Sequence, residues 1–159
     1  LDISGYDGSQ KDMGLAVHES FQSFVAQVVK IKVADNNNGF VVEKVYCSVD
    51  CGIVINPDIV TAQMESGIIY GLSATIKPQV TFSDGAVVES NFHDLPVLRM
   101  NESPDIEVSI VHNLESPGGV GEIAVPPVAA AVSNAVFNLT GQRLRELPLV
   151  LGSNAGGSA

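Results

Sequence analysis

The chain has 159 residues, a mass of 16.7 kDa and a formal net charge of −10 at pH 7. This length is enough for one domain with its own core, and a hydrophobic fraction of 45% excludes a disordered chain. The eight Lys and Arg residues disfavour a nucleic-acid partner, and the longest apolar runs, such as residues 67–76, fall well short of the roughly 20 residues that span a bilayer. We therefore expect a soluble, globular single domain over residues 1–159.

The cysteines and the chain ends bear on the protein's surroundings. Cys47 and Cys51 lie four positions apart in a predicted strand, about 13 Å along it, which is too far for a disulfide. We expect buried free thiols. The N-terminus has neither an initiator Met nor a secretory signal. We expect an excised, C-terminal piece of a longer chain with poor order at 1–13 and 150–159, and both cytoplasm and periplasm remain open.

The first predicted element is a β-hairpin. Residues 24–34 end in alternating apolar and polar positions, and residues 40–50 are rich in β-branched side chains. The stretch 35-DNNNG-39 between them is typical of a turn.

A helix is predicted next, over residues 59–76. It is preceded by Asn56 as a candidate N-cap, Pro57 as the first helical residue and Asp58 as a first-turn acid. Apolar and glycine positions recur at three- and four-residue spacing and predict one buried stripe, formed by Val60, Met64, Gly67, Ile68, Gly71, Leu72 and Ile76.

Three residues of this helix have two interpretations each. Gly67 and Gly71 lie four apart, and close packing against a sheet is favoured over a ligand contact, because glycine weakens a helix and needs a packing reason. Gln63 lies near the same face, where a lone amide is more often a hydrogen-bonded core group than a ligand.

The remaining elements alternate short strands with irregular chain. A second hairpin is predicted over 79–90 with Asp84-Gly85 as its turn, followed by the irregular segment 91–104, a strand over 105–113 and a helix over 128–141. The order β-β-α-β-β-β-loop-α predicts an α+β fold with helices packed on a mixed or antiparallel sheet.

Most common catalytic patterns are missing. His18, His93 and His112 are scattered, and none has a second His or Cys at ligand spacing, so no zinc site is predicted. No Ser lies in a G-x-S-x-G motif, and neither Cys has an obvious partner for nucleophilic catalysis.

The stretch 115-ESPGGVGEIAVPP-127 is the strongest candidate site. Its glycines could bind an anion through their backbone amides, although the stretch is neither a P-loop nor a dinucleotide-binding fingerprint. Glu122 has two interpretations. It is either an acid that stabilises a helix N-terminus, or a general base that a tight glycine loop brings close to a bulky ligand.

These residues also carry a family resemblance. The segments 14–31, 49–74, 91–100, 115-ESPGGVGE-122 and 126–149 resemble, in order and approximate spacing, the C-terminal end of the molybdenum hydroxylases, the xanthine dehydrogenase and aldehyde oxidoreductase family. The bacterial isoquinoline 1-oxidoreductase-like beta (large, molybdopterin-binding) subunits are the most similar. The resemblance implies the α+β fold of the molybdopterin-binding domain of aldehyde oxidoreductases.

The resemblance also implies an activity. Glu122 corresponds to the family's catalytic base, which accepts a proton while water-derived oxygen is transferred to an N-heteroaromatic (isoquinoline-like) or aldehyde substrate. Gln63 corresponds to a glutamine that contacts the molybdenum-molybdopterin cofactor, and Gly119, Val120 and Gly121 correspond to the metal side of the loop. None of these residues is implied to be a metal ligand. The implied partners are a small [2Fe-2S] subunit and the upstream part of the same subunit.

Two departures from the family pattern matter. Many relatives have proline directly after the glutamate, whereas this chain has Ile123. The family's upstream segments, which supply further cofactor loops and the substrate channel, lie outside the 159 residues, so we expect this piece alone to be inactive and free of cofactor. The rival hypothesis is a non-catalytic α+β binding or assembly module in which Glu122 is a helix-terminal acid and the glycine loop binds an anion.

Overall fold

The computed structural model describes residues 6–34, 39–77 and 79–151. The predicted turn at 35–39 and the ends predicted to be poorly ordered lie partly outside these ranges. Those expectations therefore stay predictions.

Four strands form one mixed sheet in the order β1-β2-β3-β6. The strands are β1 (Met13–Ser20), β2 (Ser23–Val33), β3 (Phe40–Asp50) and β6 (Asp105–Ile110). β1, β2 and β3 pair antiparallel, and β6 pairs parallel to β3. The predicted hairpin of β2 and β3 and the predicted α+β class with a mixed sheet are confirmed.

The strand β1 was not among the predicted elements. It joins β2 through the two residues Phe21 and Gln22, whose φ angles are 54° and 62°. Such a left-handed pair is typical of tight hairpins, but it usually contains Gly, Asn or Asp. The sequence therefore carries no turn signal here, and the strand before the turn shows only a weak alternation of burial.

Two helices accompany the sheet. The helix α1 (Pro57–Ile76) begins as predicted, with Asn56 Oδ1 accepting a hydrogen bond from Ile59 N at 3.2 Å. The helix α2 (Pro126–Thr140) ends at Gly141, whose φ of 76° is the left-handed conformation that commonly terminates helices. Neither helix has the length and apolarity needed to cross a membrane, and the same holds for the described chain as a whole.

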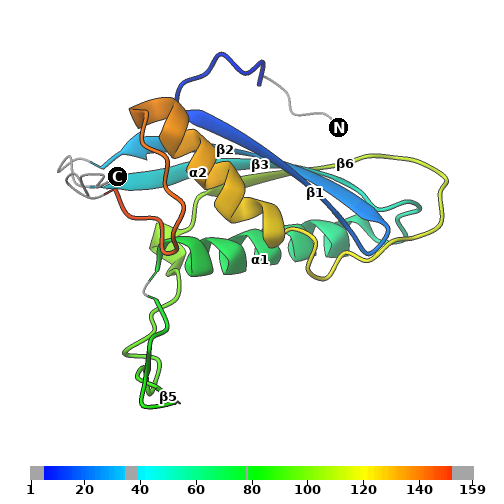
Figure 1. Ribbon diagram of the computed structural model, residues 1–159. Helices are drawn as coiled ribbons and strands as arrows, with labels where there is room; N and C mark the ends of the chain where they lie inside the picture. The colour runs from blue at the N-terminus through cyan, green and yellow to red at the C-terminus, as the bar shows by residue number, and fades with distance from the viewer. Residues whose placement is uncertain (1–5, 35–38, 78, 152–159) are drawn as a thin grey trace.

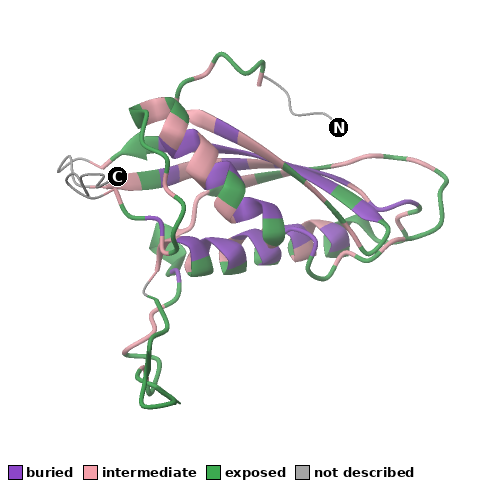
Figure 2. Cartoon of the chain, in the orientation of Figure 1, coloured by how far each residue is buried: buried purple, intermediate pink, exposed green. Residues whose placement is uncertain are grey.

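The helices form a layer against the sheet (Figure 1). α2 contacts β1 and β2, while α1 contacts α2 and β6. The core lies between these layers, and Figure 2 shows buried residues along the inner sides of both helices. Its largest fully buried members are Val25, Val29, Ile31, Val45, Val49, Met64, Ile68, Leu72, Ile123 and Val128.

The predicted stripe of α1 is buried except for Ile76, which is half-buried, but the partner of its glycines differs from the prediction. A Cβ added at Gly67 would lie 2.9 Å from Ala124 Cβ, and one at Gly71 would lie 2.9 Å from Val128 Cγ2. The glycines therefore allow close packing against the start of α2 and the loop before it. The prediction that they pack against a sheet was wrong, because α2 lies beside α1 in the helix layer.

Residues 79–98, named here the arm, project away from this layered body (Figure 1). The arm contains the short hairpin of β4 (Phe82–Ser83) and β5 (Ala86–Val87), turned by Asp84 and Gly85 as predicted, with φ angles of 51° and 79°. Most of its residues are exposed, as Figure 2 shows in green. Beyond the arm, the predicted irregular segment contains a short 3-10 helix, η1 (Met100–Glu102).

Candidate functional site

The Glu122 loop, residues 118–125, connects the sheet to α2 and is tied to the hairpin of β1 and β2. Gly118 N donates to Cys51 O at 2.9 Å, and Gly119 N donates to Phe21 O at 2.8 Å. Two of the amides that an anion would need therefore already have partners within the protein. This arrangement weighs against the glycine loop as an anion site.

Steric contacts explain the two glycines at positions 118 and 119. A Cβ at Gly118 would overlap the backbone of Gln22 and the hydroxyl of Ser23, and one at Gly119 would lie 2.8 Å from Phe21 Cβ. The loop and the hairpin turn approach each other so closely that no side chain fits between them. These glycines serve the packing of the chain against itself.

The second half of the loop is anchored in the core by two buried side chains. Ile123 and Ala124 are 0% and 1% exposed, and Val125 N donates to Glu122 O at 2.9 Å, which closes a turn. Gln27 Nε2 donates to Ala124 O at 2.7 Å. Glu122 itself is exposed. Its carboxylate therefore extends outward from a backbone whose next two residues are immobilised in the core.

The position of Glu122 does not match that of a helix cap. α2 begins at Pro126, four residues later, its N-cap is Val125, and no side chain caps its first turn by a hydrogen bond. A carboxylate stabilises a helix N-terminus chiefly within or next to the first turn. The interpretation of Glu122 as a helix-terminal acid therefore receives no support from the structure.

Glu122 lines a hollow of about 580 Å³, named here the Glu122 hollow. The end of β1, the middle of α1 and the Glu122 loop form its walls. Its other polar side chains are His18, Ser20, Ser66 and Tyr70. The tertiary structure thus brings a carboxylate, an imidazole, a phenol and two hydroxyls to one concave surface.

Sequence reasoning missed these polar neighbours. His18 and Ser20 belong to β1, which was not predicted, so nothing connected them with Glu122, more than 100 positions away. Ser66 and Tyr70 directly precede the two glycines of the α1 stripe and lie four residues apart, on one side of it. The stripe itself was the available signal, because residues that flank a close contact between two elements line the edge of that contact.

The other candidate residues differ in whether they line the Glu122 hollow. Gly121 lines the hollow, and a Cβ added there would meet no atom within 4 Å. Val120 is half-buried and packs against the core, and the Gly119 amide is already paired. Gln63 is half-buried one turn before Gly67, about 6 Å along the helix axis, and is not among the residues of the hollow.

The described residues contain no group of three or more His, Cys, Asp or Glu side chains that could hold a metal ion. The backbone is open to an approaching group at Gly121, whereas the chain's own hairpin fills the space at Gly118 and Gly119.

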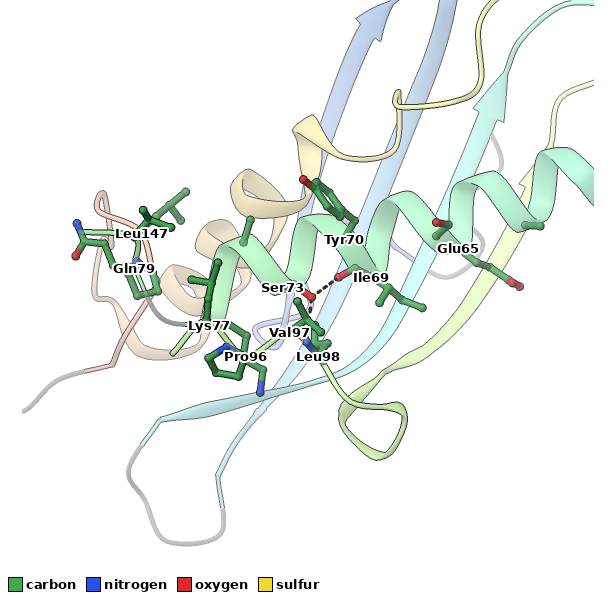
Figure 3. Close-up of a pocket in the computed structure, with 16 residues that line it drawn as sticks. Glu65, Ile69, Tyr70, Ser73, Lys77, Gln79, Pro96, Val97, Leu98 and Leu147 are labelled. Carbon is green, nitrogen blue, oxygen red and sulfur yellow. Dashed lines mark hydrogen bonds between the residues drawn. The ribbon is translucent and has the colours of Figure 1, made fainter. Parts of the chain in front are cut away.

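A second concavity of about 900 Å³, the outer groove, lies between the outward face of α1 and the base of the arm (Figure 3). It is adjacent to the Glu122 hollow, because Ser66 and Tyr70 line both. Ser73 fixes its edge: its Oγ donates to Ile69 O at 3.0 Å and accepts from Leu98 N at 3.1 Å. The groove is mainly apolar, with Ile69, Val80, Leu95, Pro96, Val97, Leu147 and Pro148 along it.

The class of this protein follows from a match of sequence, with which the fold agrees. Residues 6–104 match the family described as "Molybdopterin cofactor-binding domain". The chain belongs to this family, as the resemblance predicted. The matched residues include Gln63 and His18 and end before the Glu122 loop.

Individual relatives extend the comparison. The chain is 40% identical over 142 residues to the isoquinoline 1-oxidoreductase subunit beta of Brevundimonas diminuta, covering 89% of this chain and 18% of the relative. Among solved structures, quinoline 2-oxidoreductase from Pseudomonas putida 86 has a TM-score of 0.69 at 23% identity, covering 79% of this chain and 17% of that one. Aldehyde oxidoreductase from Desulfovibrio desulfuricans has a TM-score of 0.68 at 25% identity, covering 79% and 14%. The chain thus spans less than a fifth of each of these proteins.

Proposed function

We propose that this chain is part of the molybdopterin-binding large subunit of a molybdenum hydroxylase that oxidises an isoquinoline-like N-heteroaromatic or an aldehyde with water-derived oxygen, and that Glu122 is its general base. The observation that carries the proposal is the position of Glu122. Its carboxylate is exposed in the hollow, while hydrogen bonds of Gly118 and Gly119 hold the backbone before it and burial of Ile123 and Ala124 holds the backbone after it. The names of three relatives, isoquinoline 1-oxidoreductase, quinoline 2-oxidoreductase and aldehyde oxidoreductase, support the substrate class.

When bound, the molybdenum cofactor supplies the oxygen-transfer and electron-accepting chemistry. Glu122 takes up the proton of the attacking oxygen on a carboxylate oxygen. A general base must hold its position within hydrogen-bond reach of the proton that it accepts. The anchoring of Ile123 and Ala124 in the core meets that requirement, because it limits the motion of Glu122 to its own side chain.

The cofactor contacts follow the geometry. Gly121 is the loop position best suited to the close approach of a cofactor, because it is open and lies beside Glu122. Gly119 and Val120 would contact the cofactor only through backbone atoms that face the solvent. Gln63 would reach the cofactor from α1, one turn away from the hollow.

The partners that we propose are the upstream part of the same subunit and a small [2Fe-2S] subunit. The apolar outer groove and exposed side chains such as Ile59 and Tyr70 support further protein over α1, because soluble proteins rarely leave such surfaces open. The upstream part is the occupant that the short coverage of the relatives suggests. The chain by itself is then inactive and free of cofactor.

The rival candidate is a non-catalytic module whose glycine loop binds an anion. The amides of Gly118 and Gly119 already have partners within the protein, and this disfavours the rival candidate. Titration of the purified chain with inorganic phosphate, followed by shifts of the amide resonances of residues 118–121, tests this candidate directly.

The test of the proposal uses the full-length subunit together with its partner. Glu122→Gln should lower kcat at least about 100-fold, because removal of a general base commonly costs that much, while the molybdenum content stays unchanged. Glu115→Gln is the matched control, since Glu115 is an exposed carboxylate of the same segment that does not line the hollow. Full turnover by Glu122→Gln would show that the base is another group.

A further inference from the structure

Gln27 is an unusual residue of the core. It lies in the middle of β2 and is 0% exposed, and its register partners are Ala16 on β1 and Cys47 on β3. Burial raises the pKa of the Cys47 thiol to about 12, against a smaller lowering by its hydrogen-bond interaction with the Gln27 side chain, so the thiol beside Gln27 is neutral. The amide of Gln27 therefore sits in uncharged, largely apolar surroundings.

The hydrogen bond of Gln27 ends on the Glu122 loop. Its Nε2 donates to Ala124 O at 2.7 Å, joining residues 97 positions apart in the chain. Ala124 is the second residue after Glu122 and lies inside the turn closed by Val125 N and Glu122 O. A shift of the Ala124 carbonyl would therefore change the direction in which the Glu122 side chain points.

Gly67 holds Ala124 from the opposite side. A Cβ at Gly67 would lie 2.9 Å from Ala124 Cβ, so α1 already touches this residue without a side chain of its own. Ala124 is thus confined between a hydrogen bond from the sheet and the backbone of a helix. Close-packed interiors transmit such constraints, because they leave no space for a small shift.

The arrangement has a cost that packing alone does not explain. Gln27 Oε1 is buried and has no hydrogen-bond partner among the described residues. An unpaired buried acceptor is unfavourable, whereas an apolar side chain of the same length would fill the space without that cost. The directional bond to Ala124 O is what an apolar residue could not supply.

We infer that Gln27 is a positioning residue for Glu122: its buried amide fixes the Ala124 carbonyl and, with Gly67, sets the direction of the Glu122 carboxylate. Its effect on turnover rests on the proposed function, whereas its effect on the loop does not. Gln27 does not line the Glu122 hollow and acts only through the loop backbone.

The test compares two variants of the full-length subunit, purified with its cofactor and partner. Gln27→Met keeps the length of the side chain but removes the bond to Ala124 O. Thr75→Val is the matched control, because Thr75 is also buried and its Oγ1 makes a bond of the same length, 2.7 Å, to Gly71 O within α1. Hydrogen exchange of a peptide covering residues 119–126 is measured beside kcat, KM and the melting temperature.

For Gln27→Met we expect faster exchange in residues 119–126, a kcat that falls about 10- to 100-fold as expected for a misplaced catalytic group, and little change in KM or melting temperature. Thr75→Val should leave loop exchange and kcat as in the wild type. The inference is overturned if Gln27→Met leaves loop exchange unchanged. It is equally overturned if exchange rises throughout β2 and β3 in step with a lower melting temperature, since that pattern marks a general loss of stability.

The two proposals fail separately. If Glu122→Gln keeps full turnover, the proposed function is wrong, but the exchange comparison between Gln27→Met and Thr75→Val still decides whether Gln27 positions the loop. If loop exchange changes while kcat does not, Gln27 orders the loop without orienting a base, and the positioning role in catalysis is overturned.

Discussion

The Glu122 loop and the arm are both irregular connections, yet the protein holds them in opposite ways. The backbone bonds of the loop end on the body of the fold, at Cys51 O and Phe21 O, and its Ile123 lies in the core. The arm is stabilised mainly by itself: the Glu89 carboxylate accepts hydrogen bonds from Thr81 N and Oγ1. A segment bonded to the core has its backbone conformation fixed by the core, whereas a segment bonded mainly within itself leaves its side chains exposed for contact.

The side chains of the two regions differ accordingly. The loop buries its apolar residues and exposes a carboxylate. The arm exposes most of its apolar residues, with Phe82 at 74% and Phe92 at 85%, and buries Leu98 at its end. The first pattern suits a site that orients one reactive group, and the second suits contact with further protein.

The largest contrast is expected from truncation of one apolar side chain in each region. Ile123→Ala should destabilise the chain by about 2–5 kcal/mol, as usual for a fully buried aliphatic side chain, because Ile123 is 0% exposed. Phe92→Ala should change stability by less than about 0.5 kcal/mol, as usual for an exposed position. Urea unfolding of the purified chain, followed by circular dichroism, measures both. Equal effects would mean that the arm packs as firmly as the loop.

A smaller effect of defined sign is expected at the contact between α1 and the loop. Gly67→Ala gains about 1 kcal/mol of helix propensity but loses about 1–3 kcal/mol through overpacking, because Ala124 cannot move away without its backbone. The net result should be a loss of stability.

The control in the same helix is Ser66→Ala, at an exposed position where alanine should stabilise by a few tenths of a kcal/mol. The two unfolding free energies should thus change in opposite directions, although both variants place alanine in α1. Stabilisation by Gly67→Ala would contradict a tight contact with the loop.

The smallest effect is a loss of stability at acid pH that is confined to the arm. The hydrogen bonds from Thr81 hold the pKa of Glu89 below its ordinary value of 4.5. A carboxyl group whose pKa is lowered by folding stabilises the folded form above its unfolded pKa, and this contribution is lost as the pH falls through the folded pKa. Hydrogen exchange in residues 79–90, corrected for the intrinsic pH dependence, should therefore rise below pH 4.5, with no such rise in residues 118–125.

Glu89→Gln is the control for this titration. The amide keeps an acceptor for Thr81 but carries no charge, so the acid-dependent step should disappear and the arm should exchange faster at neutral pH. A step that persists in Glu89→Gln would assign it to another group.

Ile123 explains how this chain departs from its family pattern without losing a rigid loop. Proline after the glutamate would restrict the backbone by its ring. Isoleucine restricts this segment by a different route, because its side chain is fully buried in the core. The departure noted in the sequence is therefore compatible with the proposed role of Glu122.

Much of the fold was predictable because its signals are local. Asn56 and Pro57 begin α1, Gly141 ends α2, and Asp84-Gly85 turns the arm, each through its own backbone preferences. The strand β1 escaped because the turn at Phe21 and Gln22 adopts left-handed conformations without the usual residues, which only the pairing with β2 enforces.

The sequence by itself determined the class of fold, the apolar stripe of α1, the family and the candidate status of Glu122, because periodicity, turn residues and motif order are properties of neighbouring residues. Only the tertiary structure decided what surrounds Glu122. It used the amides of Gly118 and Gly119 for packing, brought His18 and Tyr70 to the hollow, and tied Gln27 to Ala124. These contacts join residues far apart in the chain, and their geometry depends on how a helix layer closes over a sheet.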